Sequence, residues 1–141
     1  MSSSIEEKLY TLCKMILQLD NSIRFIGIAN NLGSLVATAY RAGLTPLMDK
    51  QETSRYAIQA VLRAATREDF ESKIGRLQYS IGKYDRLTRA TIPITLFGKE
   101  SKSKFYYLLL SFDLNFNVID VIENRIMSFI QKIRSGSYSI Y

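Results

Sequence analysis

Three segments of the chain repeat their apolar residues every three or four positions, which is the spacing of an amphipathic helix. This spacing predicts helices over about 4–19, 50–69 and 118–134. The second helix can also continue to Ile74, in which case it ends by Gly75. The three apolar stripes consist of Ile5, Leu9, Leu12, Ile16 and Leu19, then Tyr56, Ile58, Val61, Leu62 and Ala65, then Val118, Ile119, Ile122, Ile126, Phe129, Ile130 and Ile133.

Each of these segments begins with residues that can cap the first turn of a helix. Ser4 and Asp49 are followed three residues later by Glu7 and Glu52, which is the spacing of a capping box. Asn117 is the candidate cap of the third helix. Such side chains bond the free amides of a helix start, so they support the predicted starts of all three helices.

Shorter segments between the helices are rich in β-branched and aromatic residues, which is typical of strands. The sequences "IRFIGIA" (23–29) and "SLVATAYR" (34–41) flank "NNLG" (30–33), so we expect a β-hairpin. A four-residue loop that ends in glycine suits a type I turn followed by a left-handed residue, a conformation that Gly33 adopts without steric cost. A glycine and a proline shortly afterwards interrupt the second strand.

The section after the second helix alternates apolar and polar residues over 77–85 and 86–96, which predicts two further strands. Pro93 marks either a sheet edge or the end of its strand, since proline has no amide hydrogen for a ladder. The polar stretch 97–104 is expected to be a flexible loop. The strand over 105–113 is apolar on both faces, so we expect it at the centre of the sheet.

Together these elements follow the order α-β-β-α-β-β-β-α. This order predicts a five-stranded, mainly antiparallel sheet with helices packed on its faces, which is an α+β fold. The length of 141 residues favours one domain. We place that domain over 1–134 and expect a flexible C-terminal tail over 135–141.

The composition argues against several kinds of catalysis. The chain contains no histidine, which removes Ser-His and Cys-His catalysis and histidine proton shuttles. Its one cysteine, Cys13, lies in an apolar helical pattern, so we interpret it as a small buried hydrophobic residue. No zinc ligand set, D-x-D cluster or EF-hand loop is present in the sequence, although carboxylates leave a magnesium or calcium site open in principle. We therefore predict no catalytic, cofactor-binding or metal-binding residues and no enzyme activity.

Nothing in the sequence is typical of a membrane-spanning or secreted protein. No apolar run approaches the roughly 20 residues of a membrane-spanning helix. The start "MSSSIEEKLY" lacks the basic and apolar regions of a signal peptide. We therefore expect a cytoplasmic protein.

The positive charge of the chain is concentrated in one segment. The formal net charge is +6, and residues 73–104 hold eight basic and two acidic residues, so the rest of the chain is neutral. Such a segment can attract an acidic protein, a nucleic acid or an anionic membrane surface. The alternative is a solvated edge on which lysine and arginine block aggregation between strands.

The order of elements resembles that of roadblock domains, within the roadblock/longin-like and profilin-like group. The likeness covers about 1–134 as topology, and the hairpin sequence "NNLGSLVA" (30–37) is similar to the first hairpin of that group. The resemblance implies a dimeric scaffold that pairs through its second helix and a sheet edge. It also implies that the scaffold engages small GTPases or acts as a platform.

Two runs resemble a family of uncharacterised proteins that is abundant in ammonia-oxidising archaea. They are "RFIGIANNLGSLVATAYRAGLTPLMDKQET" (24–53) and "KIGRLQYSIGKYDRLTRATIPI" (73–94). The shared features include Gly27 and an element formed by Arg41, Gly43 and Pro46. This second resemblance implies an archaeal origin and supplies no catalytic residues.

Three functions are compatible with these observations. The first is a non-enzymatic homodimeric interaction or scaffold module that regulates a small GTPase-like partner. Its candidate surface consists of Arg55, Arg63, Arg67, Lys83, Arg86 and Arg89. The second is a small-molecule sensor of the PAS or profilin type, whose pocket would be lined by Arg41, Tyr79, Tyr84 and Arg89. The third, which is the least favoured, is binding of a nucleic acid or an anionic surface through residues 73–104.

Overall fold

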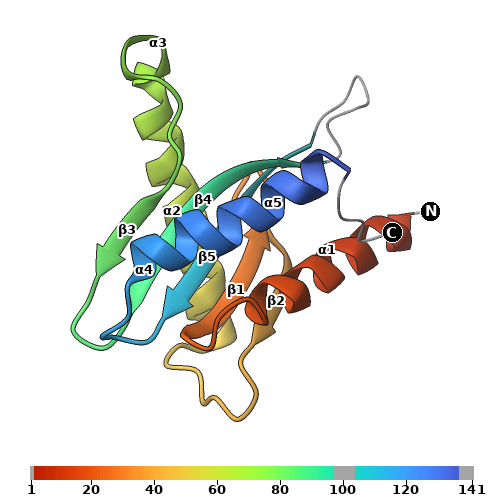
Figure 1. Ribbon diagram of the computed structural model, residues 1–141, viewed down its shortest axis with the longest axis vertical. Coiled ribbons are helices and arrows are strands. Elements are labelled where there is room, and N and C mark those ends of the chain that lie inside the picture. Colours follow the sequence, from red (N-terminus) through yellow and green to blue (C-terminus); the bar gives the residue numbers. More distant parts are fainter. Residues whose placement is uncertain (1, 97–103, 137–141) are drawn as a thin grey trace.

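The computed structural model describes residues 2–96 and 104–136, and its centre is a five-stranded antiparallel sheet (Figure 1). The strands lie in the order β2-β1-β5-β4-β3, and all neighbouring pairs are antiparallel. The predicted α+β fold and the central position of the last strand are confirmed. The bounds are β1 Ile23–Ala29, β2 Leu35–Tyr40, β3 Ser80–Lys83, β4 Thr88–Leu96 and β5 Lys104–Phe112.

Helices cover both faces of this sheet. In Figure 1, α1 and the C-terminal helical segment lie in front of the sheet, and α2 lies behind it. A short 3₁₀ turn, η1, joins α2 to α3, which projects beyond the sheet (Figure 1). The bounds are α1 Ser2–Leu17, α2 Lys50–Arg67, η1 Glu68–Phe70, α3 Glu71–Ile74, α4 Val118–Asp120, the π-helical η2 Val121–Ile126 and α5 Met127–Arg134.

The two faces bury apolar side chains to different extents. On the face covered by α1 and α5, the strands contribute alternate residues such as Ile26, Leu108 and Leu110 to a large cluster. On the face covered by α2, a smaller cluster joins Tyr107 and Leu109 to the inner side of that helix. The central strand β5 is therefore buried on both sides, as its apolar sequence predicts.

The turn between β1 and β2 has the predicted chemistry. The side-chain oxygen Oδ1 of Asn30 accepts hydrogen bonds from the backbone N–H groups of Leu32 and Ser34, at 2.9 and 3.0 Å. Gly33 has a φ of 86°, which is the left-handed conformation. A Cβ at Gly33 would lie 2.8 Å from Cα of Ile58, so this turn also packs closely against α2.

The start of α2 confirms the predicted capping box. The carboxylate of Asp49 accepts a hydrogen bond from the backbone N–H of Glu52 at 2.8 Å, and the carboxylate of Glu52 accepts one from the N–H of Asp49 at 3.0 Å. Asn117 likewise caps the third predicted helix by accepting from the N–H of Asp120 at 3.1 Å. Gly75, with a φ of 90°, ends the helical run that follows α2, also as predicted.

The predicted apolar stripe of the second helix is wrong in part, because Ile58, Leu62 and Ala65 are exposed. The buried face of α2 carries mostly small side chains, which allow a helix to approach a sheet closely. The larger Ile58 and Leu62 side chains point away from the sheet. The buried residues of this helix are Thr53, Tyr56, Ala57, Ala60, Val61 and Ala64.

Several boundaries differ from the sequence prediction by a few residues, and the starts of α1 and β3 differ for reasons that the structure shows. α1 begins at Ser2, so Ser4 lies inside the helix and does not cap it. β3 begins at Ser80, three residues later than expected, because the preceding residues contact the layers on either side. The hydroxyl of Tyr79 donates a hydrogen bond to Glu123 of η2, and Leu77 packs against the cluster under α2.

Parts of two predicted segments lie outside the described residues. These are most of the loop over 97–104 and residues 137–141 of the C-terminal tail. Ser135 and Gly136 complete the last helical turn, with Gly136 at a φ of 82°.

Candidate functional site

A cavity of about 240 Å³ opens on the α2 side of the sheet, at the end where β1 begins. Its walls come from the sheet, the segment 44–48, the first turns of α2 and the hairpin between β3 and β4. Most of the lining side chains are apolar or aromatic. The apolar and aromatic ones are Phe25, Tyr40, Leu44, Pro46, Leu47, Met48, Tyr56, Tyr84 and Leu87. The polar ones are Arg24, Thr53, Arg89 and Ser111.

Arg89 lies in the wall of the cavity, in contact with two tyrosine rings. Its guanidinium carbon is 3.8 Å from the centroid of the Tyr56 ring and 5.4 Å from that of Tyr84, which are cation–π distances. Its Nη2 is 2.9 Å from Sδ of Met48. No carboxylate among the described residues lies within ion-pair distance of Arg89. In the described part of the chain, the charge of Arg89 therefore faces two aromatic rings and a thioether.

Aromatic side chains form much of the remaining wall. The rings of Phe25 and Tyr40 have their centroids 4.9 Å apart. Gly27 makes room for this arrangement, because a Cβ there would lie 3.0 Å from Cζ of Phe25 and 2.9 Å from Cδ2 of Leu35. On the α2 side, burial raises the pKa of Tyr56, whose hydroxyl has no hydrogen-bond partner among the described residues.

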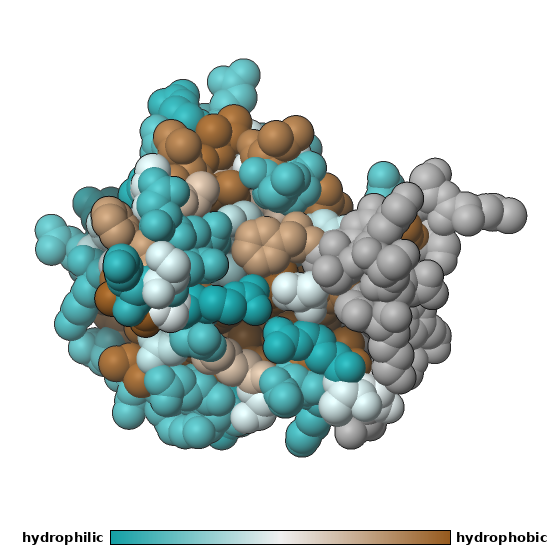
Figure 2. Space-filling model, turned by 90° about the horizontal axis from the view of Figure 1, so that it is seen from above, coloured by the Kyte–Doolittle hydropathy of each residue, from teal (hydrophilic) through white to brown (hydrophobic). Residues whose placement is uncertain are grey.

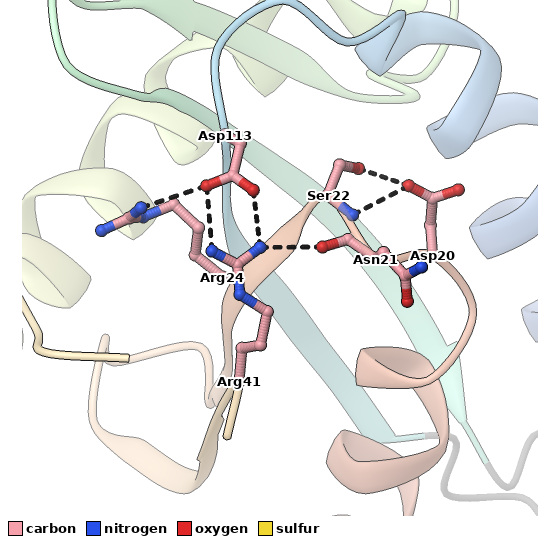
Figure 3. A network of polar contacts seen from close by, with 6 residues as sticks. All are labelled: Asp20, Asn21, Ser22, Arg24, Arg41 and Asp113. Carbon is pink, nitrogen blue, oxygen red and sulfur yellow. Dashed lines mark hydrogen bonds and ion pairs between the residues drawn. The ribbon is translucent and has the colours of Figure 1, made fainter. Parts of the chain in front are cut away.

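Beside the cavity, two arginines share the carboxylate of Asp113 (Figure 3). Nη1 and Nη2 of Arg41 donate to its two oxygens at 2.6 and 3.1 Å, and Nη1 of Arg24 donates at 3.1 Å. The hydrogen bonds from Arg41, with those from Arg24, hold the pKa of Asp113 below its usual value against the opposing effect of burial. The carboxylate is therefore ionised at neutral pH and ties β1 and β2 to the end of β5.

Backbone contacts fix this group of charges in place. Nη1 of Arg41 also donates to the backbone oxygen of Asn21 at 2.8 Å (Figure 3). The backbone N–H of Asp113 donates to the oxygen of Ser22 at 2.9 Å. Ser22 in turn donates from its N–H and its hydroxyl to the carboxylate of Asp20, at 3.0 and 2.5 Å. These contacts fix the positions of the Arg24 and Arg41 side chains beside the cavity.

A second feature lies on the outer side of α2 and α3. Ile58, Leu62, Phe70 and Ile74 follow one another at multiples of four residues, and all are exposed, Leu62 to 63% and Ile74 to 83%. We call these four residues the apolar helix surface. Figure 2 views the molecule from the α3 end and shows hydrophobic atoms gathered at the surface in its upper part. Beside this surface, the outer edge of β3 has no partner strand among the described residues.

The structure separates the six residues predicted as an interaction surface. Arg55, Arg63 and Arg67 are exposed along α2, and Lys83 and Arg86 are exposed at β3 and its hairpin. Arg89 is half-buried in the cavity wall instead. The basic segment 73–104 is described only in part, so its role in binding stays a prediction.

Two of the four residues predicted to line a sensor pocket line this cavity, and the sensor function stays a prediction. Tyr84 and Arg89 line the cavity, whereas Arg41 lies beside it on Asp113, and Tyr79 bonds to Glu123 of η2. Sequence reasoning missed Arg24, Tyr56 and Met48. No local pattern identifies them, because the three residues come together only when β1, α2 and the segment before α2 meet.

The described residues offer little for covalent or metal chemistry. Cys13 is fully buried, and burial raises the pKa of its thiol to about 12, so it carries almost no thiolate at neutral pH. Within the described ranges, no group of three or more histidine, cysteine or acidic residues is placed to hold a metal ion. The same part of the chain contains no helix that is both long and apolar enough to span a membrane.

Comparison with known proteins gives matches at the level of structure. No protein-family model and no curated protein matches the sequence. MglB from Myxococcus xanthus has a TM-score of 0.66 at 13% identity, over 96% of this chain and 92% of that one. An MglB with a tetrameric arrangement has a TM-score of 0.63 at 14% identity, over 94% and 91%. A Roadblock/LC7 domain from Streptomyces avermitilis has a TM-score of 0.61 at 9% identity, over 92% and 98%.

These matches define the class of the fold. A five-stranded antiparallel sheet with α2 on one face and the terminal helices on the other is an α+β domain that can carry many functions. Its particular form is roadblock-like, as the order of elements predicts. At these identities the likeness concerns the fold alone, so function has to be argued from the surfaces of this chain.

Proposed function

We propose that this chain is a non-enzymatic interaction module that forms a homodimer through α2, α3 and the edge of β3. The observation that carries the proposal is the apolar helix surface. Contiguous exposed apolar side chains on a folded protein usually mark a contact with another molecule. The buried side of α2 carries alanines while Ile58 and Leu62 point outward, so this helix presents much of its apolar area away from its own core.

The neighbouring edge of β3 supports a second copy as the occupant. An open strand edge offers backbone donors and acceptors that an identical strand can satisfy in antiparallel fashion. Resemblance to roadblock domains favours pairing through the same two elements. One solved structure with the same fold is an MglB with a tetrameric arrangement. We further propose that residues 1–134 form a single domain and that the protein is cytoplasmic.

A small GTPase-like protein is the proposed partner of the dimer. The exposed Arg55, Arg63 and Arg67 lie along α2 and suit a partner with an acidic surface. The roadblock resemblance favours a GTPase for that role. Because rim charges act mainly on the rate of association, this contact should weaken as the salt concentration rises.

The homodimer is tested by measuring molar mass with light scattering during size-exclusion chromatography at micromolar concentrations. We expect a dimer for the unchanged chain and a monomer for Leu62→Glu and for Ile74→Glu, because each buries a charge in the interface. Ile119→Glu is the matched control, since Ile119 is similarly exposed but lies on α4, over the opposite face of the sheet. A monomeric unchanged chain contradicts the homodimer.

The partner is tested separately with the dimer immobilised on a biosensor. We expect binding of a purified small GTPase loaded with a GTP analogue, and weaker binding by a triple variant in which Arg55, Arg63 and Arg67 become glutamine. Because these arginines lie on α2, the helix of the proposed dimer interface, the molar mass of the triple variant is measured first, and its binding is compared only as a dimer. Absence of binding in both the GTP-analogue and the GDP state would remove the GTPase and leave the homodimer standing.

A further inference from the structure

We infer that the cavity beside Arg89 binds a small organic carboxylate with an aromatic or branched apolar body. This site is separate from the apolar helix surface, because none of Ile58, Leu62, Phe70 and Ile74 lines it. The inference therefore does not rest on the homodimer. The inference specifies a ligand for the small-molecule sensor that the sequence left open as an alternative. The lining residues differ in part from those predicted, because Arg41 and Tyr79 do not line the cavity.

The charge of the cavity is unbalanced. Arg24 and Arg89 both line it, and no acidic side chain of the described residues does. Asp113, which lies beside the cavity, is shared by Arg24 and Arg41 (Figure 3). Arg89 forms no ion pair among the described residues, so the described lining of the cavity carries an excess of positive charge.

The carboxylates at the start of α2 do not correct this imbalance. Asp49 caps the helix and Glu52 lies in its first turn, close in sequence to the lining residues Met48 and Thr53. Both are occupied by the capping box, and neither lines the cavity. An anion from solution is therefore the missing partner that would satisfy Arg89.

The position of Arg89 is suited to a ligand and costly without one. A charged side chain that is partly withdrawn from water is stabilised when it gains an ion pair with hydrogen bonds. The rings of Tyr56 and Tyr84 hold the guanidinium plane by cation–π contact, so little side-chain freedom remains to be lost on binding. The same preorganisation applies to Arg24, which Asp113 fixes at 3.1 Å.

The size and lining of the cavity indicate how large the ligand is and what its uncharged part consists of. A volume of about 240 Å³ lies below the range of roughly 300–1,000 Å³ typical of pockets for drug-sized molecules, which favours a small ligand. A carboxylate is a compact, planar anion that matches the fork of a guanidinium. The rings of Phe25 and Tyr40 and the side chain of Leu44 provide apolar contacts for a short aromatic or branched body.

Binding is measured by NMR titration of the ¹⁵N-labelled full chain with phenylacetate, with phenylacetamide as a neutral analogue of the same shape. We expect saturable shifts at Arg89, Met48 and Tyr84 for the acid and at least tenfold weaker binding of the amide. Phenyl phosphate is the third probe. Equal binding of acid and amide, absence of shifts at millimolar phenylacetate, or binding of phenyl phosphate alone would each overturn the assignment.

Variants then locate the site. Arg89→Gln should weaken phenylacetate binding at least tenfold, whereas Arg86→Gln, an exposed arginine of the same hairpin that does not line the cavity, should leave it unchanged. Leu44→Trp, which keeps every charge and fills the cavity, should also abolish binding. The amide spectrum of each variant reports whether it is folded, and if Arg89→Gln unfolds, the Leu44→Trp result decides. Retained affinity in a folded Arg89→Gln or Leu44→Trp chain contradicts the inference.

Discussion

The two faces of the sheet share the same strands but are covered in different ways. The face under α1 and α5 forms a continuous core of large aliphatic side chains. The face under α2 has a smaller cluster that relies on alanines, and it also carries the cavity. One face is therefore organised for stability, and the other leaves apolar surface and space that a partner or a ligand can fill.

The same contrast explains where polar groups are found. Charged side chains that lie within ion-pair distance in the described ranges gather around the strand ends beside the cavity and at the neighbouring turn. Such groups are costly to bury unless they are paired. Arg89, which has no ion-pair partner among the described residues and contacts aromatic rings and a sulfur, is the exception, and it lies on the α2 face.

The largest expected effect comes from truncating β5 toward the face under α1 and α5. Leu110→Ala should lower the free energy of unfolding by about 3–5 kcal/mol, because a fully buried leucine leaves a cavity among rigid neighbours. Leu109→Ala, on the α2 face, should lose about 2–3 kcal/mol, since the smaller cluster can relax or hydrate. Urea unfolding measures both. Equal losses would show that the two faces are equally well packed.

The second prediction concerns the close contact between the first hairpin and α2. Gly33→Ala should cost about 2–3 kcal/mol, because it adds the strain of a left-handed residue and a clash with Cα of Ile58. Gly43→Ala is the matched control, since Gly43 also has a positive φ, 76°, but a Cβ there would meet nothing within 4 Å. The free energy of unfolding of the control variant should fall by only about 1 kcal/mol. Similar losses in thermal or urea unfolding would argue against tight packing of the turn on α2.

The third prediction tests the carboxylate at the border between the two regions. Asp113→Asn should lower the free energy of unfolding at pH 7 by about 1–2 kcal/mol, because both arginines lose a charged acceptor in a partly exposed site. Asp85→Asn, at an exposed position of the β3–β4 turn, should change it by less than about 0.5 kcal/mol.

The difference between the unchanged chain and Asp113→Asn should depend on pH. The pKa of Asp113 is lower in the folded state, so its contribution is complete above the unfolded pKa of about 3.9. As the pH falls below that value toward the lowered folded pKa, the contribution fades. Urea unfolding at pH 7 and at pH 3 should therefore show a narrowing gap. A constant gap would mean that the stabilisation does not come from the ionised carboxylate.

Local features of this fold could be predicted from the sequence where one short pattern determines the structure. The bounds of β1, the turn at Asn30 and Gly33 and the capping box of Asp49 all follow from residues within a few positions of one another. Pro93 also has the expected place, in the part of β4 that lacks an outer neighbour among the described residues. These elements need little help from the rest of the chain.

Features that depend on distant contacts could not be predicted in the same way. The segment before β3 alternates like a strand, but contacts of Leu77 and Tyr79 with two different layers keep it out of the sheet. In α2, apolar residues lie on both sides, and the sequence does not show whether the alanines or Ile58 and Leu62 face inward. The cavity is even harder to predict from the sequence, because its lining residues come from segments that meet only in the folded chain.

The short length of β3 has a consequence for behaviour at high concentration. Along the outer side of β4, the described strand β3 pairs only with Thr88–Thr91. Beyond these residues, Pro93 has no N–H group to donate to a strand from another molecule. Only four residues of β3 are left to accept a neighbour, which suits a contact of fixed register. On this side of the sheet, the fold thereby leaves a short edge that offers few places for an unrelated strand to add.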